Sequence, residues 1–311
     1  MFNKIISLSL NPAIDITLWT DTLHCGDNIV EAERYDSAGK SMNVSRALRA
    51  YGVDSTAIVL LGTHNIFRYE DRLKSEKMKY RIIPVEGYTR ENLSIIQPDR
   101  TVTRLMRDGF CVEHETIEEI LSALSEEIVE NSLVVISGKL PRGISPNVLI
   151  SICEHIASLG AKISIDTSSL TMKEIIKIKP FIVKPNIDEA SQIAQEQLKN
   201  PEDIVAFGKE LNKNGITHCI ISAGADGIYY TSSENDSFHV MVPSVDVSSS
   251  VGAGDCTLAG FIYSIQEGKN IEKCLSVAAA FGTSACLTEG TNPPPRLSCA
   301  NILQQVKIEK M

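Results

Sequence analysis

The chain has 311 residues, 43% of them hydrophobic, and a formal net charge of −9. This length suits one large α/β domain or two smaller ones, with ample material for a buried core. The acidic balance argues against a nucleic-acid binder, because phosphate backbones select clustered Lys and Arg. Residues 1–8 are too short an apolar run for a signal peptide, and no later stretch is apolar enough to cross a bilayer.

The cysteines and histidines indicate neither a disulfide framework nor a zinc site. Eight cysteines are present without a C-x-x-C pair, and most lie in apolar surroundings, where a free thiol behaves as a small hydrophobe. Six histidines are scattered without an H-E-x-x-H motif. We therefore expect a reduced, cytoplasmic protein.

The first third of the chain is predicted to be rich in strands. Residues 14–35 mix polar and β-branched side chains, so we expect short strands and turns there. Two β-rich insertions, at about 12–36 and 87–107, do not follow a helix–strand rhythm, and we expect them to pack together as a lid on a single domain of residues 1–311. The remaining elements expected here are strands at 5–10, 56–62, 82–86, 93–97 and 102–106, and a helix at 41–51.

From about residue 116 the pattern alternates between helices and apolar strands. This alternation predicts a mostly parallel sheet covered on both faces, in which ligands collect beyond the carboxyl ends of the strands. The expected helices are 117–129, 147–159, 188–196, 201–214, 256–267 and 271–287, and the expected strands are 133–137, 163–166, 181–184 and 218–222.

A small-residue run, Ser248 to Asp255, contains the most informative motif of the sequence. In it Gly252, Ala253 and Gly254 form a turn that opens a helix, so several backbone N–H groups and the helix dipole can hold an anion. Asp255 follows at once, where a base could take a hydroxyl proton during phosphoryl transfer. The alternative is an ordinary loop with an acid in the first helical turn.

The first half of the chain contributes three further motifs. Gly39 and Lys40 do not form a P-loop, because Arg34 stands where that motif requires glycine, yet a Gly-Lys turn opening a helix that contains Asn43 can still bind an anionic or hydroxyl-rich ligand. Asp15 follows the first strand, where its carboxylate can accept bonds from sugar hydroxyls or act as a turn residue. Arg90 can bind a phosphate through its planar guanidinium or pair with a neighbouring glutamate.

Two motifs of the second half also have a structural and a functional interpretation. Asn186 and Glu189, just after Lys184, form a capping-box pattern, and a functional role would place Asn186 near phosphate oxygens and Glu189 near hydrated Mg²⁺. The string from Ser222 to Gly227 follows a strand, and its glycines suit either a nucleotide-binding turn or a plain hairpin.

Together these motifs resemble the ribokinase-like carbohydrate kinases, the PfkB family, over essentially the whole chain. The opening Asn11-Pro12-Ala13-Ile14-Asp15 is similar to the branch that phosphorylates sugar phosphates, which includes 1-phosphofructokinase and tagatose-6-phosphate kinase. The other matching positions are Lys40, Asn43, Ser45, Arg46, Arg90 and Asn92, together with the Gly252–Asp255 signature.

The resemblance implies a three-layer α/β/α sandwich with a mostly parallel central sheet, a small β-sheet lid, and a homodimer formed through that lid. It implies ATP and Mg²⁺ as cofactors and Asp255 as the catalytic base, helped by the N–H groups of Gly252, Ala253 and Gly254. The substrate-binding residues implied are Asp15, Gly39, Lys40, Asn43, Arg90, Asn92 and Lys139; the ATP-binding residues are Lys184, Asn186, Ser222, Gly224 and Gly227; and the metal-binding residue is Glu189.

Three positions depart from the family pattern. Ala38 and Ser41 stand where the family often has glycine, and Lys139 replaces a small residue, so the sugar pocket is expected to differ there. The leading hypothesis is ATP-dependent phosphorylation of tagatose 6-phosphate or fructose 1-phosphate to the bisphosphate. The alternatives are a kinase of an unphosphorylated sugar or nucleoside, and a nucleotide- or sugar-binding regulator without turnover.

Overall fold

The computed structural model describes residues 1–311 and contains two β-sheets. The larger sheet has ten strands in the order β14-β13-β12-β11-β10-β9-β8-β1-β4-β5. All neighbours from β5 to β11 are parallel, whereas β12, β13 and β14 add antiparallel strands at one edge. The strands are β1 Ile5–Ser9, β4 Thr56–Gly62, β5 Lys79–Val85, β8 Leu133–Ser137, β9 Lys162–Asp166, β10 Ile182–Val183, β11 His218–Ser222, β12 Ile228–Ser232, β13 Ser237–Met241 and β14 Lys307–Lys310.

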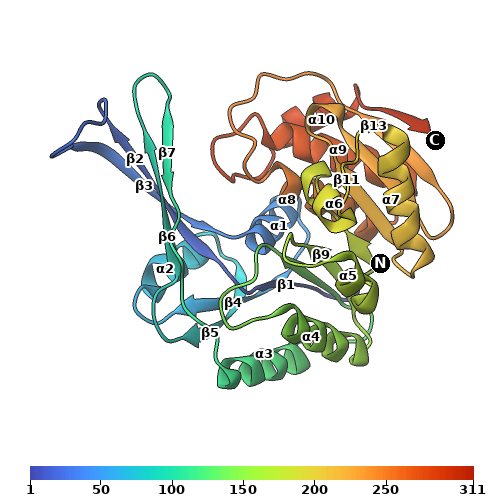
Figure 1. Ribbon diagram of the computed structural model, residues 1–311, viewed down its shortest axis with the longest axis horizontal. Helices are drawn as coiled ribbons and strands as arrows, with labels where there is room; N and C mark the ends of the chain where they lie inside the picture. Colours follow the sequence, from blue (N-terminus) through green and yellow to red (C-terminus); the bar gives the residue numbers. More distant parts are fainter.

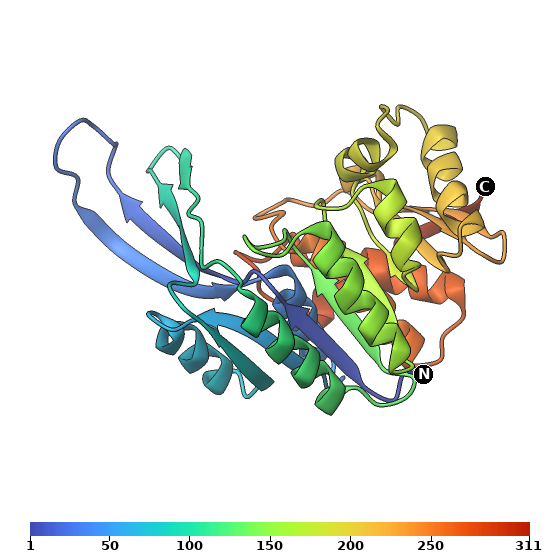
Figure 2. The ribbon, with the colours of Figure 1, turned by 60° about the horizontal axis from the view of Figure 1, so that its bottom comes forward.

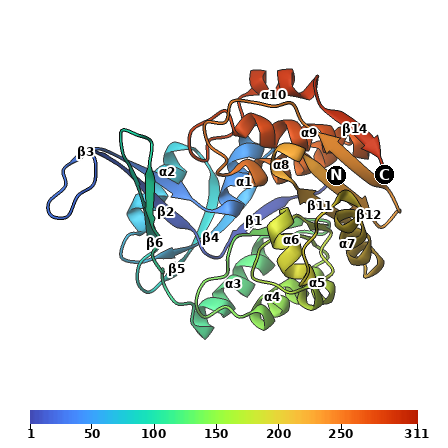
Figure 3. The same cartoon turned by 45° about the horizontal axis from the view of Figure 1, so that its top comes forward.

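Helices cover both faces of this sheet, which is why its central strands β1 and β8 are buried along their whole length. Figure 3 shows α3 to α7 on one side and α1, α8, α9 and α10 on the other. A separate apolar core lies on each side, one of 39 and one of 28 buried residues, so the expected three layers are confirmed. The helices are α1 Lys40–Ala50, α3 His114–Glu127, α4 Pro146–Ser158, α5 Met172–Ile178, α6 Ile187–Ala194, α7 Pro201–Lys213, α8 Ala253–Gln266, α9 Ile271–Ala285 and α10 Arg296–Leu303.

A four-stranded sheet, here called the lid, projects from one end of the domain (Figures 1 and 2). Its order is β3-β2-β6-β7, with strands β2 Ala13–Thr20, β3 Val30–Ala38, β6 Arg90–Ile96 and β7 Val102–Leu105. The central pair, β2 and β6, is parallel and the outer pairs are antiparallel. At its base the lid packs on helix α2 Ile66–Ser75 through a small apolar cluster that includes Tyr69 and Leu73.

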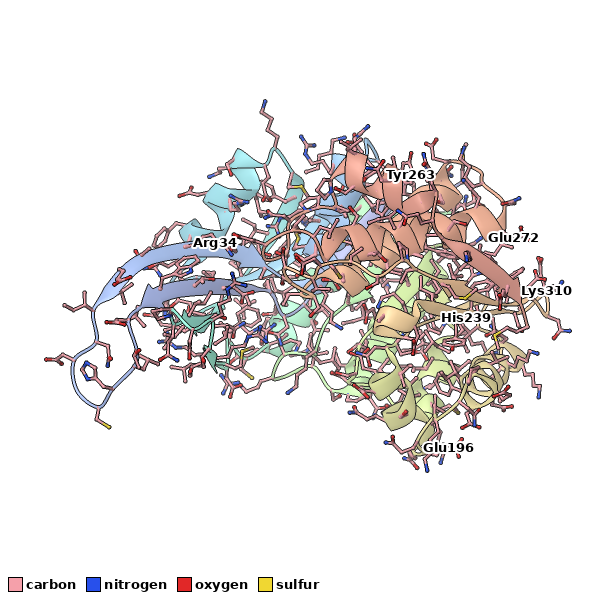
Figure 4. All side chains as sticks on the ribbon, turned by 90° about the horizontal axis from the view of Figure 1, so that it is seen from above. Arg34, Glu196, His239, Tyr263, Glu272 and Lys310 are labelled. Atoms are coloured by element: carbon pink, nitrogen blue, oxygen red, sulfur yellow. The ribbon has the colours of Figure 1, made fainter.

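The lid also contacts the main body through Arg34 on β3 (Figure 4). The guanidinium of Arg34 pairs with Asp36 at 2.8 Å and with Glu289, which follows α9, at 3.4 Å. The base of the lid therefore lies beside the loop that follows α9.

Several elements differ from the sequence-based expectations, among them α2, α5, β12 and β13, which the sequence did not predict. The prediction of short strands and turns at 14–35 was wrong, because β2 and β3 are long paired strands; β3 is exposed over most of its length, so it lacks apolar alternation. The helix at 271–287 is the last element expected from the sequence, but two more elements follow it. Helix α10 follows, and β14 pairs with β13 to extend the large sheet. No helix has the length and apolar character needed to cross a membrane.

Candidate active site

Two adjoining cavities lie beyond the carboxyl ends of the parallel strands. The first, about 360 Å³, is called the polar cavity because only 3 of its 19 lining residues are hydrophobic. The second, about 500 Å³, is called the apolar cavity because 8 of its 19 lining residues are hydrophobic. Asn186, Ser222, Ser250 and Gly254 line both, so the cavities meet at the start of α8.

The start of α8 is formed by the glycine turn that the sequence singled out. Gly252 adopts the left-handed conformation, with φ of 82°, and the helix has no side-chain cap. First-turn N–H groups of an uncapped helix remain free to bind an acceptor. Gly254 has no positive φ; its small size matters because an added Cβ would lie 3.1 Å from the Nζ of Lys184. The turn thus offers backbone donors where the two cavities meet.

Asp255 is the third residue of α8 and is 5% exposed. Its Oδ2 accepts a hydrogen bond of 2.7 Å from the Nδ2 of Asn43 on α1. Burial raises the pKa of Asp255 to about 7, and the negative charge of Asp166 adds to the rise. The hydrogen bond from Asn43 and the positive charges of Lys184 and Lys40 act in the opposite direction and lower this pKa. A carboxyl group with this pKa can accept a proton near neutral pH, as a general base requires.

Two lysines share one buried carboxylate, Asp166, at the end of β9. The Oδ1 of Asp166 lies 3.2 Å from the Nζ of Lys40, and its Oδ2 lies 3.2 Å from the Nζ of Lys184. Burial by itself lowers the pKa of Lys40, but the attraction of Asp166, Glu189 and Asp255 outweighs it and leaves that pKa raised. Lys40 is therefore charged, and its charge is balanced from within the protein.

The base of the lid supplies the opposite wall of the polar cavity. Arg90 donates to the backbone oxygens of Pro12 at 3.3 Å and Asn11 at 3.2 Å, and burial lowers its pKa. On the adjacent strand, the Oδ1 of Asp15 accepts a bond of 2.9 Å from Asn92. Burial raises the pKa of Asp15, whereas Asn92 and Arg90 lower it. The Oδ1 of Asn92 is buried without a partner, so it is available to a ligand donor.

Asn186 and Glu189 form the predicted capping box at the start of α6. The Oδ1 of Asn186 accepts from the N–H of Glu189 at 2.8 Å, and the Oε2 of Glu189 accepts from the N–H of Asn186 at 3.0 Å. The other carboxylate oxygen of Glu189 lies 3.5 Å from the Nζ of Lys40. Capping therefore occupies only one oxygen of Glu189, and the other faces the polar cavity.

The residues present fit a hydrated magnesium ion but not a metal held by the protein alone. No group of three His, Cys, Asp or Glu side chains lies close enough together to hold a metal. Two carboxylates, Asp166 and Glu189, line the polar cavity; the Oδ2 of Asp166 is ion-paired with Lys184 at 3.2 Å but accepts no hydrogen bond. Mg²⁺ at phosphoryl-transfer sites is held by one or two carboxylates, waters and substrate phosphates.

The structure brings together most of the residues singled out from the sequence. Gly39, Lys40, Asn43 and the lid residues line the polar cavity, and Gly224 and Gly227 line the apolar one. The hairpin interpretation of the Ser222–Gly227 string is correct, because the string joins the antiparallel strands β11 and β12. A Cβ at Gly227 would collide with the carbonyl of Val240 on β13.

Lys139 lies apart from the others. It is exposed and lines neither cavity, while its backbone oxygen accepts from Asn11 at 3.1 Å. Ser41 is wholly buried and does not reach the pocket either. Its hydroxyl accepts from the N–H of Ser137 at 2.9 Å and lies 3.0 Å from the oxygen of Leu8, so it joins the ends of β8 and β1. Of the three departures, only Ala38 lines the polar cavity.

The sequence reasoning missed four residues of the polar cavity. Asp166 had a usable signal, since a lone carboxylate that ends an apolar strand of a parallel sheet points to the ligand edge. Ser250 and Val251 lie in the Ser248–Asp255 run but were not themselves singled out, and Thr291 is a loop residue without a distinctive pattern.

The sequence profile described as pfkB family carbohydrate kinase matches residues 8–297. The chain belongs to this family of carbohydrate kinases, which confirms the expected class of enzyme. The 1-phosphofructokinase of Borreliella burgdorferi is 29% identical over 286 residues, which cover 91% of this chain and 92% of that protein. The tagatose-6-phosphate kinase of Staphylococcus epidermidis is 28% identical over 309 residues, 98% of this chain and 99% of that protein.

A solved structure supports the fold independently. Phosphofructokinase-2 from Escherichia coli, in complex with fructose-6-phosphate, matches with a TM-score of 0.89 at 24% identity, covering 98% of this chain and 99% of that one. The ribokinase-like fold expected from the sequence is thereby confirmed.

Proposed function

We propose that the chain transfers the γ-phosphoryl group of ATP to the free hydroxyl of a ketohexose monophosphate, giving the bisphosphate. Tagatose 6-phosphate is the first candidate substrate and fructose 1-phosphate the second. The observation that carries the proposal is Asp255, a buried carboxyl group with a pKa of about 7 beside an uncapped helix start, where two cavities of different polarity meet. Relatives named 1-phosphofructokinase and tagatose-6-phosphate kinase support this substrate class.

The apolar cavity suits the nucleotide. Its Gly224 has open space where a side chain would stand, which leaves room for a base and ribose against the backbone. The phosphates then reach the start of α8, where Lys184, Asn186 and the N–H groups of Gly252 and Gly254 are donors, whereas the N–H of Ala253 already donates to the oxygen of Ser250 at 3.3 Å. Glu189 and Asp166 are the residues that would hold Mg²⁺, which would neutralise charge on the phosphates.

The polar cavity suits the phosphorylated sugar. Asp15, Asn43 and Asn92 offer acceptors and donors to its hydroxyls. Asp255 takes the proton of the attacking hydroxyl as its oxygen bonds to the γ-phosphorus, and ADP leaves with the electrons of the broken P–O bond.

The phosphate already on the sugar is assigned to Arg90 rather than to Lys40. The ammonium of Lys40 is balanced by Asp166 and Glu189, whereas the donors of Arg90 reach only neutral backbone carbonyls. A guanidinium whose charge is not balanced by an acid binds a dianionic phosphate more strongly than an ammonium that is already ion-paired.

The lid, built from the insertions at about 12–36 and 87–107, is proposed to cover the sugar and to join two chains as a homodimer. Its exposed apolar side chains support this: Val30, Tyr35 and Leu105 are 47%, 42% and 51% exposed, and the loop residue Ile29 is 82% exposed. Apolar residues gathered on one sheet are typical of a surface that packs against another protein.

The test is an ADP-release assay over phosphorylated and unphosphorylated ketohexoses, with wild type and Arg90→Gln. One charge-assisted hydrogen bond is worth about 1.5–3 kcal/mol, so Arg90→Gln is expected to lower kcat/KM for the sugar phosphate tenfold or more and leave KM for ATP unchanged. Arg107→Gln, an exposed arginine of the lid region that pairs with Glu91, is the matched control. Equal kcat/KM for free and phosphorylated sugars would favour the neutral-sugar kinase instead, and no turnover would favour the regulator.

A further inference from the structure

The chain passes from the large sheet into the lid through a short segment, residues 86–89, which ends immediately before Arg90. The loop that follows β4, residues 63–65, runs beside this segment, and the N–H of His64 donates to the oxygen of Gly87 at 3.0 Å. The loop therefore contacts the chain at the point where it enters the lid.

Asn65, the last residue of this loop, is 3% exposed and contacts the residues on both sides of Arg90. Its Oδ1 accepts from the N–H of Thr89 at 2.8 Å, and its Nδ2 donates to the oxygen of Thr89 at 2.9 Å. The same Nδ2 donates to the Oε1 of Glu91 at 3.1 Å. Arg90 therefore lies between two residues that a single buried amide holds.

These bonds take the place of the usual role of an asparagine at such a position. Asn65 is the N-cap residue of α2, where the side-chain oxygen commonly accepts from an N–H of the first helical turn. Asn65 makes no such bond with its own helix. Its polar atoms are instead committed to the residues around the start of β6.

The backbone on the N-terminal side of Arg90 has little room to shift. Thr89 is wholly buried, and its Oγ1 accepts from the N–H of Gly62 at 2.8 Å. An added Cβ at Gly62 would collide with the nitrogen of Thr89. An added Cβ at Gly109 would lie only 3.1 Å from the nitrogen of Arg90. Close packing and hydrogen bonds of this kind fix the place of a functional side chain.

We propose that Asn65 is a positioning residue, which sets the place of the Arg90 guanidinium and through it the affinity for the phosphate already on the sugar. The inference rests on the proposed function, in which Arg90 binds that phosphate. Asn65 lines neither active-site cavity, so it acts through Arg90 and does not touch the substrate. Binding of phosphate by a planar guanidinium depends on alignment, so a small displacement of Arg90 weakens it.

The test compares Asn65→Ser with wild type, by calorimetric titration of tagatose 6-phosphate and fructose 1-phosphate and by steady-state rates. We expect Asn65→Ser to raise the dissociation constant and the KM of the sugar phosphate about fivefold or more, because Arg90 is no longer held in place. The kcat and the KM for ATP should stay near their wild-type values. Failure of the wild-type protein to bind either sugar phosphate would refute the proposed function and this inference together.

Asn212→Ser is the matched control, because Asn212 is also a buried asparagine that donates to a backbone oxygen, that of Ile216 at 3.0 Å. It lies on α7 and lines neither cavity. Its replacement should leave the affinity for the sugar phosphate unchanged. An equal loss of affinity in Asn212→Ser would mean that general destabilisation is the cause, and would overturn the inference.

A double-mutant cycle with Arg90→Gln separates positioning from a general structural role. Asn65→Ser should add nothing to the effect of Arg90→Gln, because no guanidinium is left to place. Additive effects would overturn the inference, and so would wild-type affinity in Asn65→Ser beside weakened binding in Arg90→Gln, a result that leaves the proposed function intact. Unchanged affinity in Arg90→Gln would refute the assignment of Arg90 to the phosphate, and the inference with it.

Glu91→Ala replaces Asn65→Ser in the test if circular dichroism shows that the latter does not fold. The side chain of Glu91 is 17% exposed, so its loss is better tolerated, and the variant removes one of the contacts of Asn65. We expect a smaller rise in the dissociation constant, again absent in the Arg90→Gln background. Arg107→Gln, which removes another partner of Glu91, should bind as wild type does. Wild-type affinity in Glu91→Ala would overturn the inference.

Discussion

Replacement of Asp255 by Asn tests the centre of the proposed mechanism. The amide keeps the size of the side chain, and its oxygen can still accept the bond from Asn43, so the start of α8 should keep its shape. What the variant loses is the proton acceptor, which is typically worth about 10²–10⁴ in rate. Asp255 lines the polar cavity and not the apolar one, so KM for ATP should change little.

The pH dependence gives a second, sharper readout. Burial and the charge of Asp166 raise the pKa of Asp255 to about 7, so the base is ionised above that pH and protonated below it. Its ionised fraction rises from roughly a tenth at one pH unit below this pKa to roughly nine tenths at one unit above it, so wild-type turnover should rise about ninefold to tenfold over that range. The residual activity of Asp255→Asn should lack this rise.

The same shift predicts an effect on stability with a defined sign. Between the ordinary pKa of an aspartate and about 7, the folded state holds a proton at Asp255 that the unfolded chain has released. This group's contribution to stability therefore falls as pH rises through that window. Asp255→Asn should melt at a higher temperature than wild type above pH 7, by a few degrees, and the difference should shrink in acid.

Asp188→Asn is the matched control, because Asp188 is an exposed first-turn acid of α6 that lines neither cavity. It should behave as wild type in rate and in pH profile. A well-folded Asp255→Asn protein with near-native kcat, or one that keeps the full rise in rate with pH, would refute the assignment of Asp255 as the base.

Two further substitutions test, in turn, whether the glycine turn contacts the phosphates and whether Ser41 has a purely structural role. Gly254→Val should abolish turnover while the far-ultraviolet spectrum stays native, because its Cβ would crowd Lys184 where the phosphates must approach; normal kcat would mean that the turn has no contact with them. Ser41→Ala should leave KM for the sugar unchanged but lower unfolding stability by about 1–3 kcal/mol in denaturant titrations, because the buried N–H of Ser137 loses its acceptor. A changed KM for the sugar, together with native stability, would show that Ser41 contacts the sugar and would contradict its structural role.

Local patterns in the sequence predicted much of the large sheet and its helices. Strands such as β4 and β8 are continuous apolar runs, because a parallel sheet covered on both faces leaves no side of a strand in water. Helix α6 is capped at Asn186 by the expected capping box, which needs only residues three apart. The glycine turn and Asp255 were found for the same reason, since their geometry is set by neighbours in the chain.

Partners far apart in the sequence were decided only by the tertiary structure. Asn43 and Asp255 are 212 positions apart, and nothing local shows that one orients the other. Asp166 pairs with both Lys40 and Lys184 only because β9 brings it to the shared edge of the sheet. Lys40 was expected to bind an anionic ligand, but the ion pair with Asp166 already balances its charge. Local strings fix backbone conformation through short-range sterics and hydrogen bonds, whereas burial and charge balance, and with them the pKa of Asp255, exist only after distant segments have packed together.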